Sequence, residues 1–82
     1  MVEKLHFDDL TQDTVPWEQI PKGLDWAARG ASGRADVFED EPHRLDAVWI
    51  GTRTSRIDHI HAGYQRGTCD WKDSLQRRPE GV

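Results

Sequence analysis

The sequence has a single cysteine, Cys69, among 82 residues. An internal disulfide is therefore excluded, and so are zinc modules that need two or four thiolates. The chain also lacks any apolar run near the roughly 18–20 residues that cross a bilayer. Its first ten residues, MVEKLHFDDL, do not show the basic start and apolar stretch of a secretory signal, so none is expected. These features argue against a disulfide-stapled secreted protein and against a membrane-spanning one.

Basic charge is also scarce. The chain has 11 Lys and Arg against 15 Asp and Glu, a formal net charge of −4. Residues 1–45 hold ten of the acidic side chains but only five basic ones. A nucleic-acid binder normally carries a clustered basic surface, because neutralisation of phosphates supplies most of its affinity. Here Asp58, Asp70 and Asp73 interrupt the basic residues of the second half, so a nucleic-acid partner is not expected.

The chain does contain enough apolar material for one small domain. Hydrophobic residues make up 35% of it and include four Trp, two Phe and one Tyr. Single domains usually have about 100–150 residues, so this chain forms one domain with a small core. We expect an N-terminal arm over 1–15, a single domain over 16–79 and a tail over 80–82.

Strand-like runs recur along the middle of the chain. The runs 24–29 and 34–39 flank a glycine-bounded turn, which predicts a hairpin. The runs 46–51 and 56–61 are two further strand candidates, and the polar stretch 52–55 would join them as a second hairpin. Three or four strands at a spacing of about 10–12 residues favour a small antiparallel meander.

The end of the chain has a different pattern, which predicts a short helix or helical turn over 71–78. Asp70 stands at the N-cap position, and Pro79 would end the helix. Trp71 and Leu75 are four residues apart, so both would pack on the sheet. The predicted fold class is therefore α+β, mostly β: an antiparallel meander with a short C-terminal helix packed on it.

The four tryptophans are spread along the chain, one to each proposed element. We interpret them as core residues, because a small domain gains most of its burial from large side chains. A role in stacking on single-stranded nucleic acid is disfavoured by their acidic neighbours. The predicted core consists of Trp17, Trp26, Phe38, Trp49, Trp71 and Leu75.

Part of this pattern is similar to a known group of proteins. A strand with Trp26 and Ala27, a glycine turn and Phe38 before Glu41–Pro42 are followed by a C-terminal segment. That segment contains Trp71, Ser74, Leu75, Arg78 and Pro79. The combination resembles small uncharacterised proteins encoded by tailed bacteriophages and prophages, over about residues 16–79. The resemblance implies a phage or prophage origin, a location in the bacterial cytoplasm and no assigned catalytic residue.

Two histidines are the clearest candidates for metal binding or catalysis. His59 and His61 are two residues apart, so on a strand both would project to the same face. With Cys69 they offer the imidazole and thiolate ligands that zinc prefers, and His43 or His6 would complete the set. A small metal-binding protein or metal-dependent enzyme is therefore one hypothesis. Because this spacing is not a common one, we favour a solvent-facing histidine pair beside a buried thiol, with no metal, cofactor or catalytic residue.

The function that these observations favour is binding. We expect a non-catalytic accessory protein of a phage or prophage that binds a protein partner, since aromatic residues are enriched at interfaces. The expected partner is encoded by the host and is modulated by the binding. An alternative is an inhibitor that mimics DNA through its acidic first half. The edges of so small a sheet also offer homodimerisation by strand pairing. No association with a membrane is expected.

Overall fold

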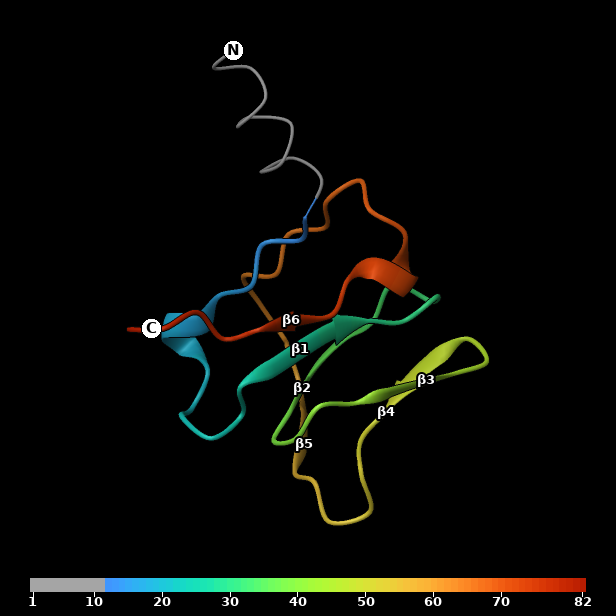
Figure 1. The fold of residues 1–82 in the computed structure, drawn as a ribbon. Coiled ribbons are helices and arrows are strands. Elements are labelled where there is room, and N and C mark those ends of the chain that lie inside the picture. Colours follow the sequence, from blue (N-terminus) through green and yellow to red (C-terminus); the bar gives the residue numbers. More distant parts are fainter. Residues whose placement is uncertain (1–11) are drawn as a thin grey trace.

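The computed structural model describes residues 12–82, which form a mostly β structure (Figure 1). The strands of this part of the chain are β1 (Trp26–Arg29), β2 (Ala35–Phe38), β3 (His43–Leu45), β4 (Val48–Ile50), β5 (Ile57–His59) and β6 (Gln76–Arg77). Two short 3-10 helices, η1 (Trp17–Gln19) and η2 (Trp71–Asp73), accompany them. The expected mostly β, antiparallel class is confirmed.

The β1–β2 hairpin forms the centre of the larger sheet. Its strands pair from Trp26 with Phe38 to Arg29 with Ala35. Gly33 has a φ of 96°, a conformation that glycine adopts without steric cost, and this lets the chain turn back tightly. The hairpin predicted from the two runs and their glycine-bounded turn is confirmed.

The strands around this hairpin are arranged differently from the predicted meander. The four-stranded sheet has the order β5-β2-β1-β6, with all its neighbours antiparallel. β5 therefore pairs with β2 and not with the strand before it, so the prediction that 52–55 closes a second hairpin is wrong. β5 ends at His59, two residues before the end of the strand candidate 56–61.

A separate two-stranded sheet, β3–β4, stands beside the four-stranded one (Figure 1). Asp46 lies in its tight turn with a φ of 54°, and aspartate tolerates this left-handed conformation better than most residues do. Sequence reasoning missed β3 because it placed Asp46 inside a strand. The hairpin is joined to the β1–β2 turn by a hydrogen bond from the Ala31 N–H to the Ala47 carbonyl, at 3.0 Å.

The helix or helical turn predicted over 71–78 is confirmed only as the turn at its start. The chain makes only the turn η2 and then continues as β6, which pairs with β1. Asp70 does cap the turn, since its side chain accepts from the Lys72 N–H. The buried Ser74 hydroxyl then accepts from the Arg29 N–H at 2.8 Å, which ties the chain to β1. Pairing with the edge of β1 satisfies backbone groups of both strands, and this outweighs the local preference for a helix.

The core lies between the four-stranded sheet and the segment that precedes it. Its apolar cluster consists of Val15, Trp17, Leu24, Ala27 and Val37, with Ile20, Ile60 and Tyr64 packed against it. Phe38, on β2, is also buried. Of the predicted core residues, Trp17 and Phe38 are thus in the interior, whereas Trp26, Trp49, Trp71 and Leu75 are half-buried. These four border the core because small residues such as Ala27 fill the space beside β1.

The predicted arm over 1–15 is only partly described. Residues 1–11 lie outside the described part of the chain. Asp13 and Val15 are buried, so this end of the arm belongs to the domain. Within the described part, neither helical turn approaches the length and hydrophobicity of a membrane-crossing helix.

Candidate functional site

A buried ion pair joins β1 to the segment before η1. Arg29 Nη1 lies 3.2 Å from Asp13 Oδ1, and the two side chains are 1% and 0% exposed. Charged groups so far from water persist only when they are paired and hydrogen-bonded. Sequence reasoning missed this pair, because nothing in the local pattern distinguishes Arg29 from a solvent-facing strand arginine.

Asp13 organises the loop before η2. Its carboxylate accepts from the Tyr64 hydroxyl and from the Gly67 N–H, the latter at 2.6 Å. On the other side of the pair, Arg29 Nη2 donates to the Cys69 carbonyl at 2.5 Å. The pair therefore holds both ends of the loop 64–69 against the sheet.

This environment changes the acidity of two groups. Burial raises the pKa of the Tyr64 phenol well above its ordinary value of 10.0, and the hydrogen bond to Asp13 and its charge add to the effect. Burial also raises the pKa of the Cys69 thiol above its ordinary value of 9.0, with the charge of Asp13 as the next cause. Both groups therefore keep their protons at neutral pH, and Cys69 is not an activated nucleophile.

A Tyr64→Phe substitution is expected to flatten the decline of stability at alkaline pH. The folded protein retains the phenolic proton at pH values where the unfolded chain releases it. This contribution is fully present below pH 10.0 and is lost as the pH rises above it. Urea denaturation of both proteins from about pH 8 to about pH 11 measures it. Tyr64 is the chain's single tyrosine, so equal slopes above pH 10.0 would contradict the expectation.

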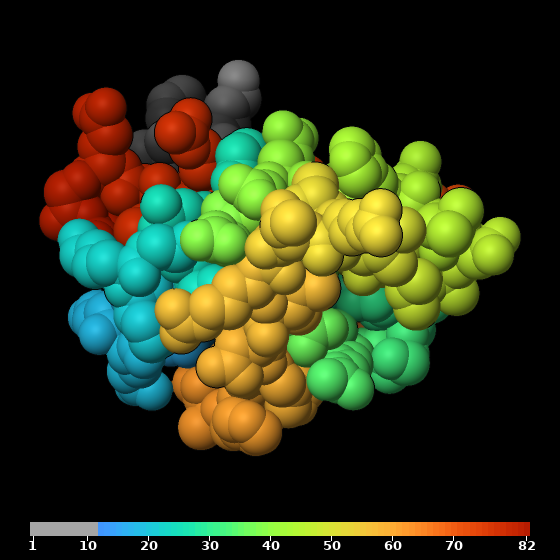
Figure 2. Space-filling model, turned by 90° about the horizontal axis from the view of Figure 1, so that it is seen from below, coloured from blue at the N-terminus to red at the C-terminus, as the bar shows by residue number. Residues whose placement is uncertain are grey.

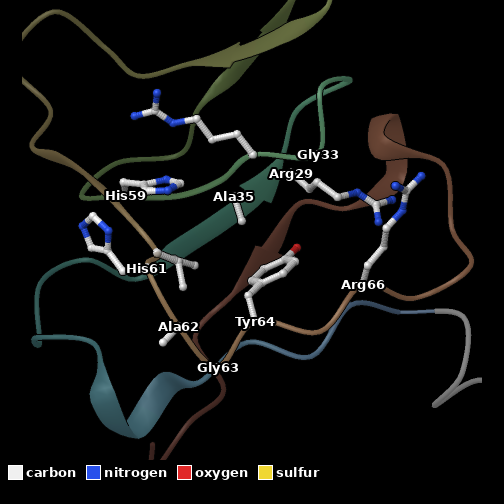
Figure 3. Close-up of a pocket in the computed structure, with 11 residues that line it drawn as sticks. Arg29, Gly33, Ala35, His59, His61, Ala62, Gly63, Tyr64 and Arg66 are labelled. Atoms are coloured by element: carbon white, nitrogen blue, oxygen red, sulfur yellow. The ribbon is translucent and has the colours of Figure 1, made fainter.

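A cleft of about 400 Å³ lies beside this buried pair (Figure 3). It is bordered by β1, β2, the end of β5 and the following loop; its lining residues are Arg29, Gly33, Arg34, Ala35, His59, Ile60, His61, Ala62, Gly63, Tyr64 and Arg66. Figure 3 shows Arg29 and Arg66 on one side, His59 and His61 on the other, and Tyr64 between them. We call this hollow the basic cleft, because none of the described residues lining it carries a carboxylate.

The histidine pair forms one wall of the basic cleft. The rings of His59 and His61 meet edge to face, with their centroids 4.8 Å apart. His59 Nδ1 also lies 3.3 Å from Asp36 Oδ1, and the same carboxylate oxygen is 3.2 Å from Arg34 Nε. A second hollow of about 260 Å³, lined in part by Ile20 and Ile60, lies against the other side of these histidines.

The structure does not bring Cys69 to the histidine pair. Its sulfur lies by Arg29 and Asp13, and Cys69 does not line the basic cleft. Within residues 12–82 no group of three or more His, Cys, Asp or Glu side chains could hold a metal ion. His43 is exposed on β3, and His6, the other candidate ligand, lies outside the described residues.

The β3–β4 hairpin exposes aliphatic side chains. The pairing of Leu45 with Val48 and of His43 with Ile50 places these residues on one face, while Trp49 lies on the other. The Trp49 Nε1 donates to the Trp71 carbonyl at 3.3 Å, which turns that second face toward η2. The first face has no cover within residues 12–82.

Ile57, at the start of β5, is a further exposed aliphatic residue near the hairpin. A side chain at Gly51 would meet the Ile57 side chain at 2.9 Å, so Ile57 abuts the end of β4. We define the aliphatic face as Leu45, Val48 and Ile50, which are 54%, 50% and 39% exposed; Ile57, beside the end of the hairpin, is 49% exposed. In Figure 2 the hairpin and the loop after it, coloured yellow-green to yellow, form a continuous projecting surface.

The fold and the two surfaces define a small antiparallel β protein with a basic cleft over a buried Arg–Asp pair and an aliphatic hairpin face. Comparison with protein-family models, with curated proteins and with solved structures finds no match to this chain. Neither the basic cleft nor the aliphatic face was predicted from the sequence. A signal for the aliphatic face was present, because Leu45, Val48 and Ile50 share one face once Asp46 is placed in a turn.

Proposed function

We propose that the protein is a non-catalytic binding module that docks a partner protein on its aliphatic face. The observation that carries the proposal is the exposure of three large aliphatic side chains on one face of the hairpin, each by at least 39%. Contiguous apolar surface on a small domain marks an interaction site more often than a structural accident. Its partner must present an apolar surface of its own, because only burial of these side chains stabilises the complex.

The surroundings of the aliphatic face support a specific contact. Asp46 is exposed in the turn beside Leu45, and Glu39 and Arg56, which are hydrogen-bonded to each other, are exposed beside Ile57. A charged rim of both signs around an apolar centre is typical of protein interfaces, where the rim sets orientation and the centre supplies affinity. β3 and β4 each also have one strand edge that no strand of the described chain covers. A partner can therefore add backbone hydrogen bonds beside the apolar contact.

The resemblance to small proteins of tailed phages and prophages supports a setting for this function. In that setting the chain is an accessory protein in the cytoplasm of a bacterial host, and its partner is a host protein that it modulates. The partner is identified here by its chemistry alone: an apolar docking surface with charges of both signs around it.

Substitution of the aliphatic face tests the proposal. Leu45→Asp and Val48→Asp, together, are expected to weaken partner binding by about 100-fold, since central apolar contacts contribute about 2 kcal/mol or more each. The partner is first captured from a bacterial lysate by cross-linking to the wild-type protein. It is then purified, and its affinity for each variant is measured by calorimetry.

The matched control places the same change outside the aliphatic face. Gln65→Asp and Lys72→Asp alter exposed residues outside the hairpin and the loop after it, and should leave the affinity unchanged. The purified partner must bind the wild type in a fixed ratio and lose affinity only with the face variants. Equal weakening by both pairs would contradict the proposal. So would sedimentation showing that the face instead joins two copies of this chain.

A further inference from the structure

We propose that the basic cleft is a binding site for a small organic phosphate monoester. This site is separate from the aliphatic face and does not depend on the function proposed for it. Four observations carry the inference: the charge of the lining, the fixed position of Arg29, the available charge of Arg66 and the apolar patch beside them.

The charge of the lining is opposite in sign to that of the whole protein. The chain has a net charge of −4, yet the basic cleft gathers three arginines and two histidines without a lining carboxylate. Asp13 and Asp36 pair with Arg29 and Arg34 from outside the lining, so the charge that an anion in the cleft would balance is that of Arg66. Guanidinium groups suit phosphate in particular, because their planar fork donates two parallel hydrogen bonds to its oxygens.

Arg29 is already fixed at one side of the cleft. Its Nη1 and Nη2 are held by Asp13 and by the Cys69 carbonyl, so no side-chain entropy remains to be lost when a ligand arrives. The Arg29 Nε is buried and has no hydrogen-bond partner in the described chain. A buried N–H without a partner is costly, and an anion in the adjoining cleft would offset its charge at short range.

Arg66 supplies the positive charge of the site that no carboxylate of the described chain balances. It is exposed, it lines the cleft, and it forms no ion pair with any residue in the described range. Asp13 balances Arg29, and Asp36 lies between Arg34 and His59. Arg66 therefore leaves a net positive charge beside Arg29, on the side that both share in Figure 3.

The rest of the cleft suits the organic part of a small molecule. Ile60, Ala62 and the Tyr64 ring provide apolar surface beside the cationic end. A volume of about 400 Å³ falls within the range of about 300–1,000 Å³ typical of small-molecule sites. A long nucleic acid is disfavoured, because the predominantly acidic surface outside the cleft would repel its other phosphates.

Binding of defined probes to the full chain tests this site. Inorganic phosphate, adenosine 5′-monophosphate, O-phosphoserine and acetate are each titrated into the ¹⁵N-labelled protein at low salt. Both monoesters should give saturable shifts confined to residues 59–66 and the β1–β2 turn. The tighter monoester identifies the source of the phosphate, a free nucleotide or a phosphorylated amino acid. Inorganic phosphate should bind more weakly, and acetate should not saturate.

The Arg66→Gln substitution tests whether binding depends on a specific site in the cleft or only on the general attraction of an anion to basic side chains. Loss of one charge-assisted hydrogen bond should weaken the monoester by about tenfold or more. Arg53→Gln removes an equally exposed arginine that does not line the cleft, and it should leave the affinity unchanged. Both substitutions are at exposed positions, and equal urea midpoints verify that the fold is kept. Equal weakening by the two variants, or acetate binding as tight as phosphate, would each overturn the proposal.

Discussion

Asp13→Ala is expected to lower the free energy of unfolding by about 3–5 kcal/mol, the largest effect of any single change considered. The substitution leaves the Arg29 guanidinium 1% exposed and without its counter-charge. It also removes the acceptor of the Tyr64 hydroxyl and of the Gly67 N–H. A domain of this size has a total stability of about 4–12 kcal/mol, so the variant approaches complete unfolding.

A double substitution distinguishes loss of a partner from loss of packing. Asp13→Leu with Arg29→Met replaces the pair by apolar groups and should be less destabilising than the sum of its two single substitutions. Urea denaturation followed by tryptophan fluorescence measures all four proteins. The control is Asp36→Ala, which breaks ion pairs to the partly exposed Arg34 and His59 and should cost about 0–1 kcal/mol. If the double substitution lowers the free energy of unfolding by the sum of the two single effects, Asp13 and Arg29 are not energetically coupled.

Arg78→Lys is expected to cost about 2–3 kcal/mol although it preserves the charge. The Arg78 guanidinium donates to Asp25 at 2.8 Å and to the backbone carbonyls of four residues in the segment before β1. These carbonyls belong to Trp17, Ile20, Pro21 and Leu24, at 2.9–3.2 Å. The group also lies 5.0 Å from the centre of the Trp17 ring. A lysine ammonium has three donors at one point and cannot reach this spread of acceptors.

The adjacent arginine provides the control for this substitution. Arg77 is exposed and lies over the Trp26 ring at 5.6 Å, and its guanidinium donates to no backbone carbonyl within residues 12–82. Arg77→Lys should therefore change stability by less than about 0.5 kcal/mol. Thermal and urea denaturation of the two variants measure the difference. Equal effects of Arg77→Lys and Arg78→Lys would mean that the geometry of the Arg78 hydrogen bonds contributes nothing.

The elements predicted correctly are those whose cause is local. The β1–β2 hairpin follows from two short runs around a glycine turn, and the capping role of Asp70 follows from its position before η2. The helical turn at Trp71 does not continue as a helix, because pairing of β6 with β1, some 50 residues earlier, decides the conformation there. β3 is missed because a single left-handed residue, Asp46, converts one apparent strand into two.

The candidate site could be predicted less well than the fold. The histidine pair was visible, since two residues separated by one lie on the same side of an extended chain. Its partners were not, because Arg29, Arg66 and Tyr64 reach the cleft from different parts of the chain. Cys69 was grouped with the histidines for its nearness in sequence, whereas the turn of the loop directs it toward Asp13.

The hydrogen bonds of Asp13 also have a kinetic consequence. They connect residues 51, 54 and 63 positions apart, through Tyr64, Gly67 and Gln76. Closing such long loops lowers the entropy of the chain before the contacts that stabilise the closed loop have formed. Proteins dominated by such distant pairings fold on a scale of about milliseconds to seconds. The β1–β2 hairpin can form early from its own turn, but both flanks of its sheet stay uncovered until the two halves of the chain meet. Docking of the loop 64–69 onto Asp13 is therefore a late event in folding.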